Sequence, residues 1–142
     1  MEVLEPKQRS LLKALKAGDR RAIGRAITLA ETNSTRAGSL FREIQPNTGR
    51  GHIIGVTGPP GSGKSTLIDG LISALRKLSH TVAVMAVDPS SPISGGAILG
   101  DRLRMASHNA DEGVFIRSLS TRGHLGGLIP SVHNVANILE FA

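Results

Sequence analysis

Residues 58–66 read Gly-Pro-Pro-Gly-Ser-Gly-Lys-Ser-Thr, which matches the phosphate-loop pattern G-x-x-x-x-G-K-[ST]. The loop follows residues 52–57, a short β-branched apolar run that predicts a buried parallel strand. A predicted helix follows, whose leucines recur at helical spacing: Leu67, Leu71, Leu75 and Leu78. This order predicts an α/β fold of the P-loop NTPase type, with a mostly parallel sheet flanked by helices.

The residue types of this loop are suited to holding nucleotide phosphates. Glycines let the backbone N–H groups curl around phosphate oxygens, and the start of a helix adds the positive end of its dipole. We expect Lys64 to reach the terminal phosphates and Ser65 to offer its hydroxyl to Mg²⁺, which prefers oxygen ligands. A glycine-rich turn without a ligand is the alternative. The predicted nucleotide-binding residues are Gly58, Pro59, Pro60, Gly61, Ser62, Gly63, Lys64, Ser65 and Thr66.

A second apolar run, residues 81–87, predicts another buried parallel strand that ends at Asp88. Ligands of such sheets bind at the carboxyl ends of the strands, so we expect the Asp88 carboxylate to face the same crevice as Lys64 and Ser65. Asp88 is therefore the leading predicted Mg²⁺ ligand, directly or through water, and with Lys64 a predicted catalytic residue. The alternative is an aspartate that simply terminates a strand before a proline.

Residues 89–100 are rich in Ser, Gly and Pro, a composition typical of a loop able to move. Nucleotide switches order such a segment with the terminal phosphate and Mg²⁺ and release it on hydrolysis. Asp101, which follows the segment, is predicted to join Ser65 and Asp88 as a metal ligand. Arg102 and Arg104 either contact phosphate or a partner, or are surface charges at the start of a helix.

A third strand is predicted at residues 113–119, followed by a glycine-rich loop at 121–127 that points at the same crevice. His124 in that loop either serves a partner or a reaction, or is an ordinary loop histidine. Pro130 is predicted to open a helix with one apolar face, formed by Val132, Val135, Ile138 and Leu139. The five histidines of the chain show no paired metal-ligand spacing, which disfavours a dedicated transition-metal site.

The first fifty residues predict a helical segment ahead of the nucleotide domain. One helix is expected at 6–16 and a second one up to about residue 31, with Gly18-Asp19 as stop and N-cap between them. Further helical turns are expected before residues 46–49. The apolar positions of these helices are Leu11, Leu12, Leu15, Ile23, Ile27, Ala30, Leu40, Phe41 and Ile44. We therefore predict a helical segment at 1–50 and the N-terminal part of a P-loop GTPase domain at 51–142.

The formal net charge of +6 is unevenly distributed. Residues 1–50 hold ten Lys and Arg against five Asp and Glu, and the remainder of the chain is nearly balanced. With no Trp or Tyr to stack on bases, a nucleic-acid partner is disfavoured, whereas an acidic protein partner remains open. Zero cysteines, no signal-like apolar core and no spanning apolar run favour a cytoplasmic protein without a membrane partner.

Three segments together resemble the methylmalonyl-CoA mutase-associated GTPase chaperones of the MeaB type, also known as lysine/arginine/ornithine transport-system ATPases or kinases. They are GPPGSGKST, VAVMAVDPSSPISGGAILGDRLRM and GVFIRSLSTRGHLGGL, and the resemblance extends over about residues 8–142. It implies GTP hydrolysis, with GTP/GDP and Mg²⁺ bound, coupled to loading and protection of a cobalamin-dependent acyl-CoA mutase. Lys64 and Ser65 would bind phosphate and Mg²⁺, Asp88 and Asp101 would belong to the metal and first switch region, and full-length members would be homodimers.

The chain departs from that family after Gly127. It has no further strand ending in an acidic residue, no Asn-Lys-x-Asp guanine-reading sequence and no dimerising C-terminal arm, so we expect a truncated chain. Two other functions stay open: an ATPase or kinase that transfers phosphate to a small molecule or transport protein, and a non-catalytic nucleotide-binding or partner-binding module. A nickel-inserting GTPase is disfavoured by the absence of cysteine.

Overall fold

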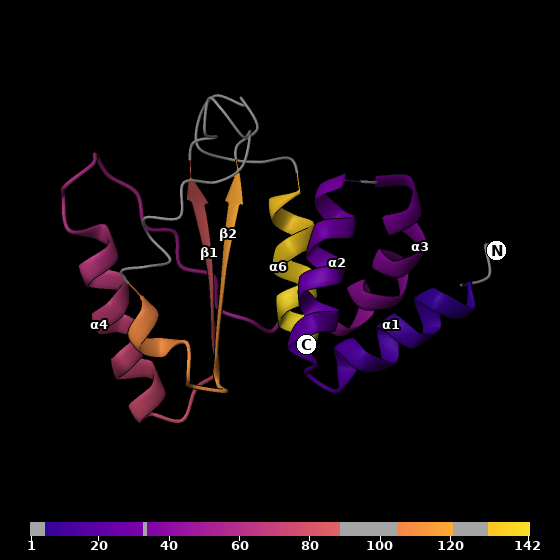
Figure 1. Ribbon diagram of the computed structural model, residues 1–142, viewed down its shortest axis with the longest axis horizontal. Coiled ribbons are helices and arrows are strands. Elements are labelled where there is room, and N and C mark those ends of the chain that lie inside the picture. The colour runs from indigo at the N-terminus through magenta and orange to yellow at the C-terminus, as the bar shows by residue number, and fades with distance from the viewer. Residues whose placement is uncertain (1–4, 33, 89–104, 121–130) are drawn as a thin grey trace. The chain divides into compact units, whose positions relative to one another are not determined.

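The computed structural model describes residues 5–32, 34–88, 105–120 and 131–142 (Figure 1). Close approach of Cα atoms divides the chain into two compact units, one formed by Met1–Ile53 with Pro130–Ala142 and the other by Ile54–Ile129. The division at residues 50 and 51 stays a prediction, and the compact units differ from it by grouping residues 130–142 with the helical segment.

The first unit is built from helices: α1 (Pro6–Lys16), α2 (Arg20–Thr32), α3 (Ser34–Ile44), the 3-10 turn η1 (Gln45–Asn47) and α6 (Val132–Phe141). The predicted helices at 6–16 and up to residue 31 are confirmed, as is the end of helical structure at 46–49. Helix α6 packs against α1, α2 and α3. The buried side chains include Leu15, Ile23, Ile27, Leu40, Ile44, Val135 and Ile138.

Local signals explain where these helices begin. Pro6 occupies the first turn of α1, where its missing N–H costs nothing, and the Gln8 side chain accepts a 3.0 Å hydrogen bond from the Glu5 N–H. Gly18, with a φ of 71°, makes the turn after α1. The Asp19 carboxylate then accepts a 2.7 Å hydrogen bond from the Ala22 N–H and caps α2, as predicted. None of the described helices is long and apolar enough to cross a membrane.

The second unit contains α4 (Lys64–Lys77), β1 (Val82–Asp88), the 3-10 turn η2 (Ala106–His108) and β2 (Val114–Ser120). The two strands pair in parallel, with Val82 opposite Val114 and Asp88 opposite Ser120, which confirms the predicted parallel pairing of these two strands. Alternate residues of a strand share one face, and here that face packs on α4. The resulting core contains Ile72, Met105, Val114 and Ile116, with Ile68, Val82 and Val84 packed against it.

The strand predicted at residues 52–57 is wrong. The described backbone there has no regular secondary structure, and the side chains of Ile53 and Ile54 are 67% and 56% exposed. An extended segment becomes a strand only when a neighbour pairs with its N–H and C=O groups. In the described part of the chain, β1 and β2 pair only with each other and provide no such neighbour.

The predicted helix after the loop is confirmed as α4, but the leucines that indicated it do not form its buried face. Leu67 and Leu78 are 63% and 69% exposed, whereas Ile72 is buried. Both Leu67/Leu71 and Ile68/Ile72 have the four-residue spacing of one helix face, so the pattern alone did not choose between the two stripes. The buried face of α4 is formed by Ile68 and Ile72. These two side chains pack against the strand residues Val82, Val84, Val114 and Ile116.

Candidate nucleotide-phosphate site

The loop that enters α4 depends on glycines at specific positions. Gly58, Gly61 and Gly63 have φ angles of 157°, 77° and 87°, values that L-residues with a side chain rarely adopt. A Cβ at Gly58 would also lie 3.0 Å from the Ser62 hydroxyl oxygen. Inside the loop, the Ser62 N–H donates a 3.3 Å hydrogen bond to the Pro59 carbonyl. The backbone conformation therefore explains both glycines of the sequence pattern, Gly58 and Gly63, and also Gly61 between them.

The amino end of α4 has no side-chain cap. Its N-cap residue is Gly63 in the left-handed conformation, and the Gly63 carbonyl accepts the first helical hydrogen bond, 2.9 Å from the Leu67 nitrogen. A glycine N-cap leaves the N–H groups of the first turn pointing outward, and the helix dipole concentrates partial positive charge there. This arrangement is suited to binding an anion such as a phosphate group.

The Lys64 side chain folds back over the loop. Its ammonium group donates hydrogen bonds of 2.8 Å and 2.9 Å to the carbonyl oxygens of Gly58 and Pro59. A flexible lysine is thereby held in one place, so its positive charge stays beside the loop backbone. A phosphate group at the start of α4 would meet a positioned cation and backbone N–H donors together.

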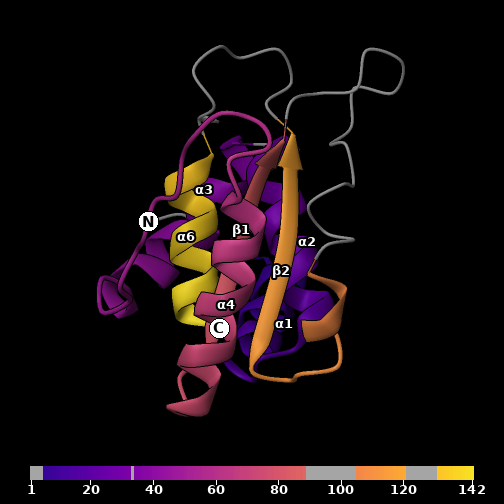
Figure 2. The same cartoon turned by 90° about the vertical axis from the view of Figure 1, so that its left-hand side faces the viewer.

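The second unit presents the strand ends and the start of α4 toward the same end. In Figures 1 and 2 the arrowheads of β1 and β2 and the first turn of α4 lie at the same end of this unit. Asp88 is the last residue of β1, as predicted, and lies opposite Ser120 in the register. For Asp88 only the backbone is described, so the direction of its carboxylate stays a prediction.

Several predicted site residues lie outside the described residues: the segment 89–100 with Asp101, Arg102 and Arg104, and the loop 121–127 with His124. Pro130 is also outside, and α6 begins at Val132 with Ser131 as N-cap. Ser65 is described and lies partly buried in the first turn of α4. In the described segments no three His, Asp or Glu side chains gather as a metal site. The Mg²⁺ ligands Ser65, Asp88 and Asp101 thus stay predictions.

The polar contacts that hold α4 in place were not predicted from the sequence. Asp69 on α4 accepts from Ser107 Oγ at 3.3 Å and lies 2.9 Å from the His108 Nε2 in η2. Arg76, in the last turn of α4, forms a forked ion pair with Asp111. The partners are more than thirty residues apart along the chain, so no local pattern marks them.

The Arg76 pair also changes the acidity of its carboxyl partner. Hydrogen bonds from the Arg76 guanidinium, and then from the Gly113 N–H, lower the pKa of Asp111 below its ordinary value of 3.8, although partial burial opposes the shift. The hydrogen bond to the Asp111 carboxylate raises the pKa of Arg76, although desolvation of the guanidinium opposes this shift. The pair is therefore fully charged at neutral pH and anchors the carboxyl end of α4, the helix whose amino end is the candidate phosphate site.

Comparison with known protein families supports a nucleotide-binding loop at residues 58–66. A family model described as "Methylmalonyl Co-A mutase-associated GTPase MeaB" matches residues 23–142. The chain belongs to the MeaB family of GTPases. Family membership confirms the resemblance drawn from the phosphate loop and from the segments around the predicted second and third strands.

Individual relatives support the same assignment. The chain is 52% identical over 130 residues to "Putative GTPase PH0274" of Pyrococcus horikoshii, which covers 92% of this chain and 41% of that protein. It is 42% identical over 135 residues to "GTPase ArgK" of Escherichia coli K12, covering 92% of this chain and 41% of the relative. A crystal structure of LAO/AO transport system kinase superposes with a TM-score of 0.67 at 25% identity, covering 99% of this chain and 40% of that one. The MeaB-family chain thus spans about two fifths of the length of these relatives.

Proposed function

We propose that residues 58–66 bind the phosphates of GTP or GDP together with Mg²⁺, and that the protein hydrolyses GTP. The single observation that carries this proposal is the position of Lys64, whose ammonium is held across the loop by Gly58 and Pro59. The uncapped amino end of α4 lies at the same loop and adds backbone donors. The guanine preference rests on family membership, because several relatives are named as GTPases.

In this proposal each residue has one role. Lys64 contacts the terminal phosphates, the backbone N–H groups of 61–66 surround the phosphate oxygens, and the Ser65 hydroxyl binds Mg²⁺. Asp88, at the carboxyl end of β1, holds the metal directly or through water, and Asp101 joins it. Bound Mg²⁺ supplies the charge that offsets the negative phosphate oxygens during transfer.

We further propose that the full protein acts as a chaperone of a cobalamin-dependent acyl-CoA mutase. Support comes from the family description, which names a mutase-associated GTPase. A relative from Streptomyces virginiae, 47% identical over 93 residues, is named for its position in the mutB 3' region. Retention of the purified mutase by the immobilised chain, measured by biolayer interferometry with GDP and with a GTP analogue, tests this step. An equal signal on a surface without the chain would reject the association for this part of the protein.

Phosphate transfer to another molecule is the second candidate, and one observation favours it: the similar crystal structure is that of a transport system kinase. A non-catalytic nucleotide-binding module is the third candidate, since the geometry of the loop and Lys64 concerns phosphate binding alone. The kinase candidate differs from the first proposal in its base preference, and the binding module differs in the absence of turnover. Binding and hydrolysis measurements distinguish the three.

Isothermal titration of the chain with GDP, a non-hydrolysable GTP analogue and the corresponding ATP analogue, each with Mg²⁺, tests the nucleotide proposal. We expect guanine-nucleotide binding that weakens at least about tenfold in Lys64→Ala, because a charge-assisted contact is lost. Lys77→Ala is the matched control, since it removes the same charge at the other end of α4 and should bind like the wild type. Equal loss in both variants, or no binding by the wild-type chain, would reject the phosphate site.

A further inference from the structure

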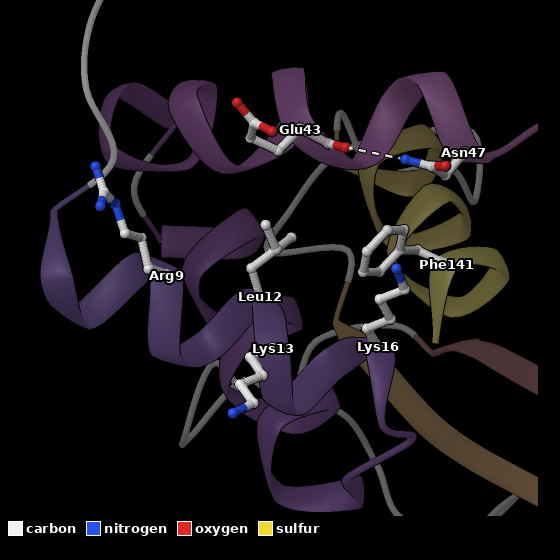
Figure 3. A pocket seen from close by; sticks show the side chains of 7 residues that line it. All are labelled: Arg9, Leu12, Lys13, Lys16, Glu43, Asn47 and Phe141. Atoms are coloured by element: carbon white, nitrogen blue, oxygen red, sulfur yellow. Dashed lines mark hydrogen bonds between the residues drawn. The ribbon is translucent and has the colours of Figure 1, made fainter.

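The helical unit has a groove on its surface that the nucleotide proposal does not use. It lies along α1 and is bounded by the end of α3, η1 and the end of α6 (Figure 3), with a volume of about 450 Å³. The groove is lined by Arg9, Leu12, Lys13, Lys16, Glu43, Asn47 and Phe141.

Positive charge dominates the rim of this groove. Arg9, Lys13 and Lys16 are spaced by four and three residues and so follow one face of α1. All three are exposed, and no ion pair joins any of them to a carboxylate within the described residues. Glu43 is the one acidic side chain among the lining residues. The rim therefore carries three cations against a single carboxylate.

The floor of the groove is apolar. Leu12 and Phe141 are half-buried, and Figure 3 shows the Leu12 side chain pointing into the hollow between the surrounding helices. An occupant that placed one or two aliphatic side chains on these residues would remove apolar surface from water, which favours association. The groove thus combines an apolar contact with cations on its rim.

We propose that this groove binds an acidic amphipathic helix of a protein partner. Arg9 and Lys16 are seven residues apart, which is about 10 Å along α1 and close to two helical turns. Carboxylates on two successive turns of a partner helix would meet them, while its apolar face would cover Leu12 and Phe141. Complementary charge of this kind increases the association rate and selects the partner.

The arrangement of the side chains disfavours the other anionic occupants. A small phosphate compound needs donors that converge on one point, whereas Figure 3 shows Arg9 and Lys13 directed away from each other. A nucleic-acid backbone would meet the Glu43 carboxylate in the lining and would leave Leu12 and Phe141 without an apolar partner. Phe141 is the one aromatic side chain in the lining, whereas a single strand needs several such surfaces for successive bases to stack on.

Fluorescence anisotropy of the full 142-residue chain tests the proposal. The probe is a labelled helical peptide of about 20 residues, with leucines on one face and glutamates on the other. We expect micromolar binding that the double variant Arg9→Glu/Lys16→Glu weakens at least about tenfold and that Leu12→Ser weakens about threefold or more. The matched control is Arg21→Glu/Arg25→Glu on α2, which makes the same change in net charge outside the groove and should bind within about twofold of the wild type.

The competing outcomes are distinct. Equal weakening by the control variant would attribute binding to net charge and overturn the proposal. So would tighter binding of a labelled single-stranded oligonucleotide, or of vesicles rich in anionic lipid, than of the peptide. No peptide binding at about 100 μM would also overturn it. Far-ultraviolet circular dichroism verifies that each variant is folded, and Lys64→Ala should leave peptide binding unchanged, which separates this groove from the nucleotide site.

Discussion

Arg76 forms a forked contact with Asp111, in which its Nε lies 2.8 Å from Oδ2 and its Nη2 lies 2.9 Å from Oδ1. Arg76 stands in the last turn of α4, and Asp111 precedes β2 by three residues. The pair is extended by the Gly113 N–H, which donates to Asp111, and by the His80 carbonyl, which accepts from Arg76. The end of the helix and the beginnings of both strands are thereby joined at one corner.

Asp111→Asn should lower the urea midpoint of unfolding at neutral pH, because the neutral amide cannot form the charged pair. The folded pKa of Asp111 lies below its ordinary value of 3.8, so the pair contributes stability above that pH and loses it as the pH falls through the folded pKa. The difference between wild type and variant should therefore shrink below pH 3.8. Circular dichroism is the suitable probe, since the chain lacks Trp and Tyr.

Glu112→Gln is the control for Asp111→Asn, because it removes the same charge from an exposed neighbour and should leave the midpoint unchanged. Gly113→Ala should reproduce the loss, since an added Cβ would overlap the Arg76 guanidinium. A pH-independent difference between wild type and Asp111→Asn would contradict the role assigned to the ion pair.

Two glycines of the second unit should respond in opposite ways to alanine. Gly63→Ala places a Cβ at a φ of 87° and should cost about 1–2 kcal/mol of unfolding free energy. Gly70→Ala lies inside α4, where an added Cβ meets no heavy atom within 4 Å, and should stabilise the chain by about 0.5–1 kcal/mol. Urea unfolding measures both values. Gly63→Ala should in addition weaken nucleotide binding, whereas Gly70→Ala should not.

That contrast tests the loop geometry directly. If both variants changed the unfolding free energy by the same amount and sign, Gly63 would not be in the left-handed conformation. Nucleotide affinity lost in Gly70→Ala as well as in Gly63→Ala would place the cause in α4 as a whole rather than in its first turn.

The cap of α2 gives a third prediction. Asp19→Ala removes the 2.7 Å hydrogen bond to the Ala22 N–H and should lower the unfolding free energy by about 1 kcal/mol. Asp19→Ser, whose hydroxyl oxygen accepts the same bond, should retain most of the stability. Urea unfolding of the two variants measures the difference. Equal losses would show that the carboxylate acts through something other than capping.

Features that depend on neighbouring residues were predictable from the sequence. The helices of the first unit follow from periodic leucines and isoleucines, and Gly18-Asp19 marks the boundary between α1 and α2 because turn and cap chemistry are local. The conformation of the loop at residues 58–63 was predictable for the same reason. Its glycine spacing reflects three backbone positions with positive φ, and Lys64 is close enough along the chain to reach Gly58.

Features that depend on distant partners were not predictable in this way. Residues 52–57 have the composition of a strand, but strand formation needs a second strand beside them, and composition does not supply one. The choice between the two apolar stripes of α4 was made by Val82, Val114 and Ile116, which lie elsewhere in the sequence. The contact between Arg76 and Asp111 was unpredictable for the same reason, because the two residues are 35 positions apart along the chain.

Helix α6 provides the last prediction, because it joins the helical unit although more than eighty residues separate it from α3. Ile138 is fully buried, so Ile138→Ala should cost about 2–5 kcal/mol through lost contacts and the cavity left behind. Hydrogen exchange should then become faster in α2, against which α6 packs. His133→Ala on the exposed side of α6 should leave exchange in α2 unchanged. Faster exchange in α4 but not in α2 would instead place α6 with the nucleotide domain, as the boundary at residue 51 predicted.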